Sequence, residues 1–247
     1  MKLHHSRNTV KLTAGVVVCA LVVTAGQVSA AMLTNGDFEE ATFDSGWINS
    51  GATAADELVL GGNTTSAELD GGDSLRQEFA ASDAEELLQG TAEFYLRFAD
   101  FTDGTRIRLR GDGNASDLIT LRVNSTGQLQ RFSGSWGDIA VPAFSQDETY
   151  RVQIALNDLA GSRTFDVFTS AGEAGVPSGE LALANSDTGL TAFHSAPLGT
   201  GLGTLTFEAG NSVFRLDNVS VEIPEPSTIA LGGLILGLTC LYHRRQR

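Results

Sequence analysis

Three arginines in one short segment have the spacing needed to bind an acidic ligand. Arg106, Arg108 and Arg110 alternate with Ile107 and Leu109. Successive side chains of a β-strand point to opposite faces, so the arginines would share one face while the aliphatic residues face a core. A guanidinium holds a carboxylate through two parallel hydrogen bonds, which would suit the carboxylates of uronic acid sugars. The alternative is a solvent-facing stripe whose arginines pair with acidic side chains of the chain itself.

Two further features could extend such a surface. Arg122, in the next expected strand, has the same parity as the arginine stripe. Trp136 lies in the polar stretch Ser133–Gly137 and could stack on a sugar ring from a loop, as could Trp47. For each tryptophan the alternative is partly buried packing, because aromatic residues make up only 7% of the chain and would be used sparingly in a core.

Residues for catalysis are scarce. The stretch Glu68–Asp73 is the nearest approach to the laminarinase-type signature Glu-x-Asp-x-x-Glu, but it ends in aspartate. Its Gly71–Gly72 pair is typical of a hairpin turn, which would break the strand that must hold both carboxylates. A lyase would need several convergent polar residues, and the central segment has one histidine, His194. The sequence therefore favours a protein that is not an enzyme, with a glycan lyase or glycoside hydrolase as the minor alternative.

The elements that must position these residues are short strands. Gly, Asn, Asp, Ser and Thr recur every eight to twelve residues between alternating runs, which is typical of an all-β sandwich or barrel. The clearest expected strands are Ser74–Phe79, Glu93–Phe98, Thr105–Arg110, Leu118–Val123, Tyr150–Asn157, Thr164–Thr169, Thr204–Phe207 and Phe214–Ile223. One helix is expected from Ser82, because Ser82 and Glu85 have the spacing of a capping box.

The middle of the chain, 93–170, resembles the concanavalin A-like or laminin-G-like jelly roll. The resemblance rests on the Glu93–Phe98 strand, the Leu118–Val123 strand turning into 128–132, and the pair formed by 150–157 and 164–169. It implies an antiparallel β-sandwich. The stretches 32–47 and 216–221 also resemble carbohydrate-binding modules of the galactose-binding jelly-roll type, which is the alternative.

Both families commonly carry a structural calcium that ties an early strand to the last one. The resemblance implies Glu39 and Asp217 as ligands here, with Asp37 as a further oxygen donor. Calcium takes six to eight oxygens, some of them from backbone carbonyls. The alternative is that Asp217 and Asn218 form a polar corner before an edge strand.

The first 30 residues have the order of a secretory signal peptide. Basic residues precede an apolar run, Leu12–Ala25, and the small residues Val28, Ser29 and Ala30 follow. The apolar run is shorter than the roughly 20 residues needed to span a bilayer, which favours cleavage after Ala30 over a permanent anchor.

The last 25 residues have the order of a membrane-sorting tail. Pro224, Glu225 and Pro226 precede an apolar segment, 229–242, and a basic end, 243–247. This arrangement resembles the PEP-CTERM sorting signal of Gram-negative bacteria that make extracellular polysaccharide. The resemblance implies a transmembrane sorting helix, recognition by an exosortase in the inner membrane, and cleavage near Pro224–Pro226. The alternative is an ordinary C-terminal anchor.

The charge and the cysteines narrow the class further. The formal net charge is −14, and six basic residues lie in the end segments, so the central segment 32–222 is more acidic still. This charge argues against nucleic acid and anionic lipid as partners. Cys19 and Cys240 both lie in the end segments, which leaves the central domain without a disulfide.

The sequence thus predicts an exported protein of the cell surface or extracellular matrix. We expect it to bind the exopolysaccharide of a biofilm matrix through Trp136 and the arginine stripe. A structural, acidic matrix protein without a discrete ligand site is the alternative. Calcium is the one expected cofactor.

Overall fold

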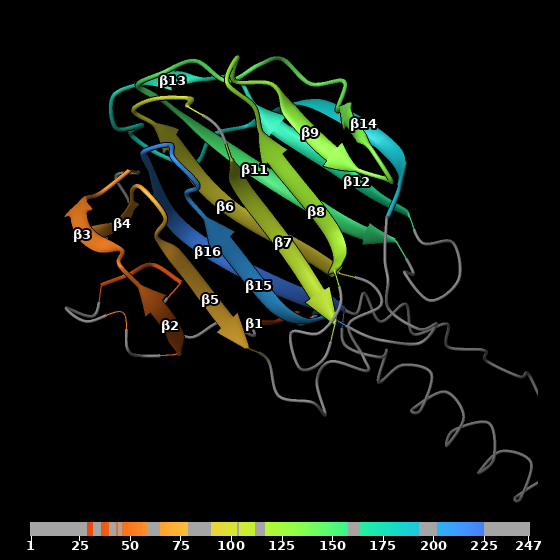
Figure 1. The fold of residues 1–247 in the computed structure, drawn as a ribbon, viewed down its shortest axis with the longest axis horizontal. Helices are drawn as coiled ribbons and strands as arrows, with labels where there is room; N and C mark the ends of the chain where they lie inside the picture. Colours follow the sequence, from red (N-terminus) through yellow and green to blue (C-terminus); the bar gives the residue numbers. More distant parts are fainter. Residues whose placement is uncertain are drawn as a thin grey trace, which may run out of the picture. The chain divides into compact units, whose positions relative to one another are not determined.

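The computed structural model describes residues 29–31, 36–39, 43, 46–58, 65–78, 90–102, 104–111, 117–157, 164–192 and 202–224. Every regular element in these ranges is a β-strand, and the strands form two antiparallel sheets (Figure 1). The all-β prediction is therefore confirmed. The expected helix from Ser82 and most of the two end segments lie outside the described residues. Within the described ranges no helix is long and apolar enough to cross a bilayer.

Sheet A runs in the order β14-β12-β11-β6-β16-β4-β3, with β13 paired to β11 and β1 paired to β16. Its strands are β1 (Ser29–Ala31), β3 (Thr53–Asp56), β4 (Thr65–Leu69), β6 (Gly90–Phe98), β11 (Glu148–Asn157), β12 (Thr164–Ser170), β13 (Glu173–Ala174), β14 (Leu183–Thr191) and β16 (Phe214–Pro224).

Sheet B runs in the order β10-β9-β8-β7-β15-β5-β2. Its strands are β2 (Trp47–Ser50), β5 (Ser74–Glu78), β7 (Thr105–Gly111), β8 (Asp117–Val123), β9 (Leu129–Phe132), β10 (Trp136–Asp138) and β15 (Leu202–Glu208). Figure 1 shows β15, from the C-terminal part of the chain, lying between β7 and β5.

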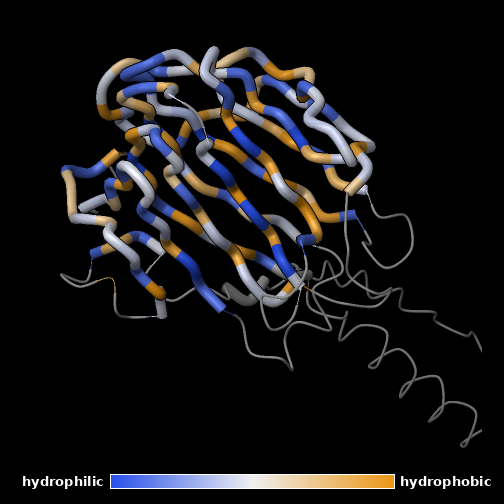
Figure 2. Tube along the Cα trace, viewed as in Figure 1, coloured by the Kyte–Doolittle hydropathy of each residue, from blue (hydrophilic) through white to orange (hydrophobic). Residues whose placement is uncertain are grey.

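The core lies between the two sheets. Phe94 of sheet A packs edge-to-face on Phe207 of sheet B, with ring centroids 5.1 Å apart, and both rings are fully buried. Apolar and polar residues alternate along the strands (Figure 2). In β11 the predicted inward set is confirmed: Tyr150, Val152, Ile154 and Leu156 are all buried.

All eight strands expected from the sequence are present, with ends that differ by at most three residues. Strands β3 and β14 were not predicted. Alanine makes up half of β3, and β14 carries several small and polar residues, so neither segment shows the apolar alternation of a half-buried strand. Both are edge strands of sheet A, where one side of the backbone has no neighbour.

Loops cover part of the outer face of sheet A. Leu58 and Leu181 pack on Tyr95 of β6 to form a small buried cluster outside the main core. Arg151 of β11 donates to the Leu181 carbonyl at 3.1 Å and pairs with Glu93 at 2.8 Å. These contacts fix the segments around residues 58 and 181 against the sheet.

The described part of the chain begins and ends at neighbouring positions. Strand β1 is antiparallel to the end of β16, with Ser29 opposite Pro224 and Ala31 opposite Glu222. The predicted signal-cleavage residue Ala30 and the first proline of the predicted sorting motif therefore lie on adjacent strands. Glu225 and Pro226 lie outside the described residues.

Candidate functional site

The arginine stripe lies on the outer face of sheet B. Ile107 and Leu109 are fully buried, while Arg106 is exposed and Arg108 and Arg110 are partly exposed, so the predicted alternation is confirmed. Pairing of β7 with β8 places Arg122 directly opposite Arg106. Like charges directly opposite one another on adjacent strands are destabilising.

Trp136 lies on the same face. It is the first residue of β10 rather than part of a loop, and it stands opposite Phe132 of β9. The Arg122 guanidinium carbon lies 4.2 Å from the centre of the Trp136 ring, a cation–π contact. Phe132 packs edge-to-face on the same ring, with centroids 5.2 Å apart. Arg122 thus contacts the Trp136 ring and lies opposite Arg106, and we call these three residues, from β10, β8 and β7, the Trp136 platform.

Ion pairs divide the arginines into two groups. Arg108 pairs with Glu208 at 3.0 Å and with Asp117 at 3.9 Å, and Arg110 pairs with Asp117 at 2.8 Å. For these two residues the alternative interpretation, pairing with the chain's own carboxylates, is the one that the structure supports.

The platform arginines differ from the two paired arginines. Arg122 donates through Nε to the neutral Gln130 at 2.7 Å, and Gln130 donates to Asp138 at 2.7 Å. Within the described residues, Arg106 and Arg122 make no ion pair. On the outer face of sheet B, the arginines without an ion pair in the described structure are therefore Arg122, which contacts Trp136, and its neighbour Arg106. The sequence indicated Arg122 by its parity but did not place it in the site.

The predicted calcium ligands contact the same segment of chain. Asp217 is fully buried and accepts hydrogen bonds from the backbone N–H of Leu58 at 3.0 Å and of Asn218 at 2.8 Å. Glu39 accepts from the N–H of Thr65 at 2.9 Å. The two carboxylates thus hold opposite ends of the segment 58–65. Among the described residues no group of three or more acidic, histidine or cysteine side chains could hold a metal ion, so the calcium site stays a prediction.

Asp217 also corrects the alternative proposed for it. It lies inside β16 and pairs with Tyr95 of β6, so it does not precede an edge strand, but the register shift after it and the φ of 47° at Asn218 do make a polar corner there. The other tryptophan, Trp47, is buried in the core against Phe38 and Phe207, in agreement with the packing interpretation.

The carboxylates considered for catalysis do not share a strand face. Gly71 and Gly72 form a turn between β4 and β5, closed by the hydrogen bond from the Asp73 N–H to the Asp70 carbonyl at 2.7 Å. The prediction that glycine breaks the strand is confirmed. The turn is not a hairpin, however, because β4 and β5 belong to different sheets. His194 lies outside the described residues.

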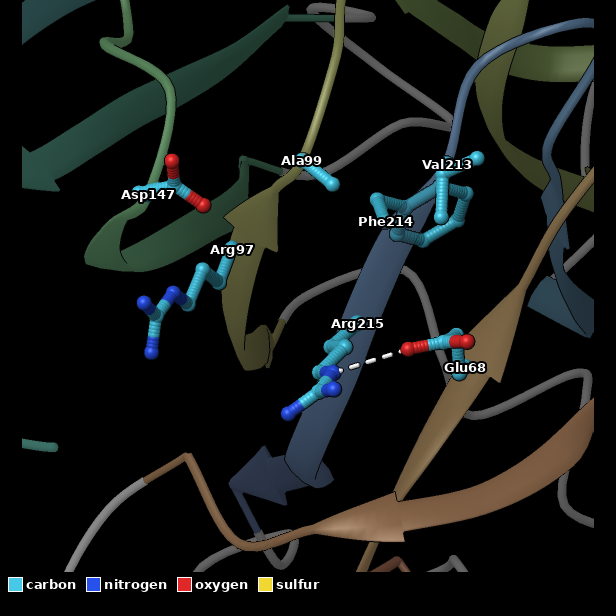
Figure 3. A pocket seen from close by; sticks show the side chains of 7 residues that line it. All are labelled: Glu68, Arg97, Ala99, Asp147, Val213, Phe214 and Arg215. Carbon is cyan, nitrogen blue, oxygen red and sulfur yellow. Dashed lines mark hydrogen bonds and ion pairs between the residues drawn. The ribbon is translucent and has the colours of Figure 1, made fainter. Parts of the chain in front are cut away.

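A hollow of about 140 Å³ lies on the sheet A side (Figure 3). Its lining includes Arg97, Asp147 and the ion pair between Arg215 and Glu68, with Nε and Oε2 2.9 Å apart. Arg97 stands opposite Arg215 on the neighbouring strand and makes no ion pair within the described ranges. The one aromatic residue of the lining, Phe214, is fully buried, and two carboxylates balance the two arginines, so this hollow is the weaker candidate.

No family model matches the chain, and no curated protein matches it. Solved structures do share its fold. Domain 4 of AbnA, an extracellular GH43 arabinanase from Geobacillus stearothermophilus, in complex with arabinotriose, has a TM-score of 0.50 at 10% identity, over 79% of this chain and 93% of that one. A carbohydrate esterase from the Shiga toxin-encoding bacteriophage phi24B gives 0.49 at 12% identity, over 80% and 100% of the two chains. At these identities the likeness shows a shared β-sandwich fold.

Proposed function

We propose that this protein is a non-catalytic carbohydrate-binding protein that holds an acidic polysaccharide on the outer face of sheet B. The observation that carries the proposal is the Trp136 platform, where an aromatic ring and two arginines without a carboxylate partner in the described structure lie side by side. An indole face packs against the C–H side of a sugar ring, and a guanidinium forks onto a carboxylate. A uronic acid unit presents both groups together.

The net negative charge of the protein bears on where an acidic polysaccharide can bind. The chain carries a formal net charge of −14, so an acidic polymer is repelled by most of its surface. Arg106 and Arg122, which lie opposite one another without an ion pair in the described structure, would then confine an anionic ligand to the Trp136 platform. We infer that the platform selects a polyuronate or another acidic heteropolysaccharide over a neutral polymer.

The finer fold assignment belongs to the same proposal. We assign the sandwich to the concanavalin A-like jelly rolls, with the galactose-binding type as the alternative. The arabinanase domain with a related fold is in complex with arabinotriose, and this supports a sugar ligand for the fold without identifying one for this chain.

Export and sorting complete the proposal. A signal peptide cleaved after Ala30 and a tail of the PEP-CTERM type cleaved near Pro224–Pro226 would bring the domain to the cell surface or the extracellular matrix. The tail would contact the inner membrane and an exosortase only transiently. The strongest support is the order of the proline-containing motif, apolar segment and basic end in the sequence.

Affinity electrophoresis tests the binding. The full chain, kept soluble in mild detergent, is run through native gels that contain alginate, a polyuronate, or dextran, a neutral polymer. We expect retardation in alginate alone. Trp136→Ala combined with Arg106→Ala should raise the apparent Kd at least tenfold, because a stacking contact and a charge-assisted contact are both lost. The effect should weaken at high salt.

Arg97→Ala is the matched control, because it removes an arginine without an ion pair from the outer face of the other sheet. Equal loss from both variants, or no loss from the platform variant, contradicts the proposed site. Migration that is the same in every gel favours the structural matrix protein, and a cleared zone in a stained gel favours an enzyme.

A further inference from the structure

A second hollow, of about 270 Å³, lies on the outer face of sheet B, toward the edge strand β2. Its lining comes from β2, β5, β7 and β15 and shares no residue with the Trp136 platform, although both include one arginine of β7. We propose that this hollow is a subsite for one neutral sugar unit of the chain that the platform holds. The proposal rests on the proposed function and extends it to a heteropolysaccharide with both acidic and neutral units.

The first observation is an unpartnered polar group at the hollow. Thr206 lines it and is only 4% exposed, yet its hydroxyl has no hydrogen-bond partner in the described structure. Nε of Arg76, the cross-strand neighbour of Thr206, is also buried and unpartnered. Buried polar groups are almost always hydrogen-bonded. Thr120 and its cross-strand neighbour Arg108 have the same unpartnered atoms, but they do not line the hollow, whereas Thr206 and Arg76 lie where a ligand with hydroxyl groups can bind.

The second observation is an exposed apolar side chain beside these polar groups. Ile48 lies directly opposite Arg76 in β2, lines the hollow and is 48% exposed. Ser50 and Ser74 add hydroxyl groups from the same two strands. A site with one apolar surface and several hydroxyl partners matches a sugar ring, which has an apolar C–H face and a hydroxylated rim.

The charges of the hollow indicate a neutral unit. Each charged residue of the lining already has an opposite partner: Arg76 pairs with Glu78 at 3.1 Å, and Glu208 pairs with Arg108 at 3.0 Å. Arg110 likewise pairs with Asp117. An anion would have to compete with these carboxylates. The ligand gains access to Thr206 by shifting Arg76, whose pair with Glu78 is partly solvent-exposed and hence weak.

The geometry allows one polymer to occupy both sites. Arg122 of the platform and Arg76 of the hollow are separated by three strand spacings, β8 to β7 to β15 to β5. At about 4.8 Å per spacing this is about 14 Å across the sheet, a distance that a short run of linked sugar rings can bridge. Linked units would bind with higher avidity than either unit alone.

The test compares Thr206→Val with Thr204→Val in the full chain. Thr204 is a matched control, because it lies on the same strand and face, is 1% exposed and has an unpartnered hydroxyl, but does not line the hollow. Valine has nearly the shape of threonine, so both variants should melt at or above the wild-type temperature. The probes are xanthan, which has neutral and uronic acid units, and alginate, which has uronic acid units alone.

We expect Thr206→Val to raise the apparent Kd for xanthan about fivefold, the loss of one hydrogen bond, and to leave alginate retardation unchanged. Thr204→Val should alter neither. Equal xanthan binding by the two variants, with alginate retardation still dependent on Trp136, would overturn the subsite and leave the proposed function standing. An equal loss in both gels would also overturn it, because the hollow would not then select a neutral unit. No retardation of the wild type in either gel would refute the proposed function and the subsite with it.

Discussion

The outer faces of the two sheets both arise from strands in which apolar and polar residues alternate. They differ in whether their polar side chains have hydrogen-bond or ion-pair partners within the protein. On sheet A, Asp217 accepts from backbone N–H groups and Arg151 is shared between Glu93 and a covering loop. On sheet B, Arg106 and Arg122 make no ion pair within the described ranges, and several threonine hydroxyls there have no partner. The polar groups that hold the covering loops on sheet A are used by the fold, with Nε of Arg151 as an exception, whereas more of those on the outer face of sheet B lack partners in the described structure. Leaving them without partners has a cost in stability that a ligand would offset.

The largest effect is expected where the cover of sheet A is fixed. Asp217→Ala removes the acceptor of two backbone hydrogen bonds at a fully buried position. Since hydrogen bonds to a charged group contribute about 1.5–3 kcal/mol each, the free energy of unfolding should fall by about 3 kcal/mol, as measured by urea denaturation. Asp56→Ala, at an exposed position of β3, should change it by less than about 0.5 kcal/mol. Similar values for the two variants would show that the cover does not depend on Asp217.

An intermediate effect is expected if an ion contributes to the same cover. Glu39 and Asp217 hold opposite ends of the segment 58–65, so calcium bound there would tie that segment to β16. We expect chelation with EDTA to lower the melting temperature by several degrees, and added calcium, but not magnesium, to restore it. The measurement is thermal denaturation followed by circular dichroism. An unchanged melting temperature would show that calcium does not stabilise this region and that the backbone hydrogen bonds act without it.

The smallest effect is expected at alkaline pH. Burial raises the pKa of Tyr95 above its usual value of 10.0, Leu181 and Arg151 oppose the shift, and Glu93 and Glu180 add to it. The folded protein therefore holds this proton more tightly than the unfolded chain. The resulting stability is present in full below pH 10 and is lost as the pH rises through the folded-state pKa.

Urea denaturation at pH 9 and pH 11 measures this loss. Tyr95→Phe should lose less stability than the wild type between the two values, because it has no phenol to ionise beneath Leu58 and Leu181. Tyr150, whose pKa is also raised by burial and by its hydrogen bond to Glu148, remains in both proteins, so some loss should persist. An identical pH dependence would mean that ionisation of Tyr95 does not open the cover.

The sequence predicted the fold better than the site because alternation is a local property. Each run such as 105–110 states which residues face inward, and these were predicted correctly. Strand order is not local, so the sequence could not show that β8 and β10 bring Arg122 onto Trp136, or that β15 lies between β7 and β5. Nor could the sequence show which arginines form ion pairs and which do not, since Glu208, the partner of Arg108, is distant in the chain. Thr206 gave no signal at all, because an unpartnered hydroxyl is recognisable only from its surroundings.

The position of Ala31, the residue that follows the proposed cleavage site, beside the end of β16 makes this domain suitable for insertion into other proteins. The chain enters and leaves the sandwich on adjacent strands, with Ala31 opposite Glu222. A short linker could join these two points, and the domain could equally be inserted into a surface loop of a host protein without forcing that loop apart. The inserted domain would be attached to the host protein at one place. The proposed binding face of sheet B could then be studied without the export segments.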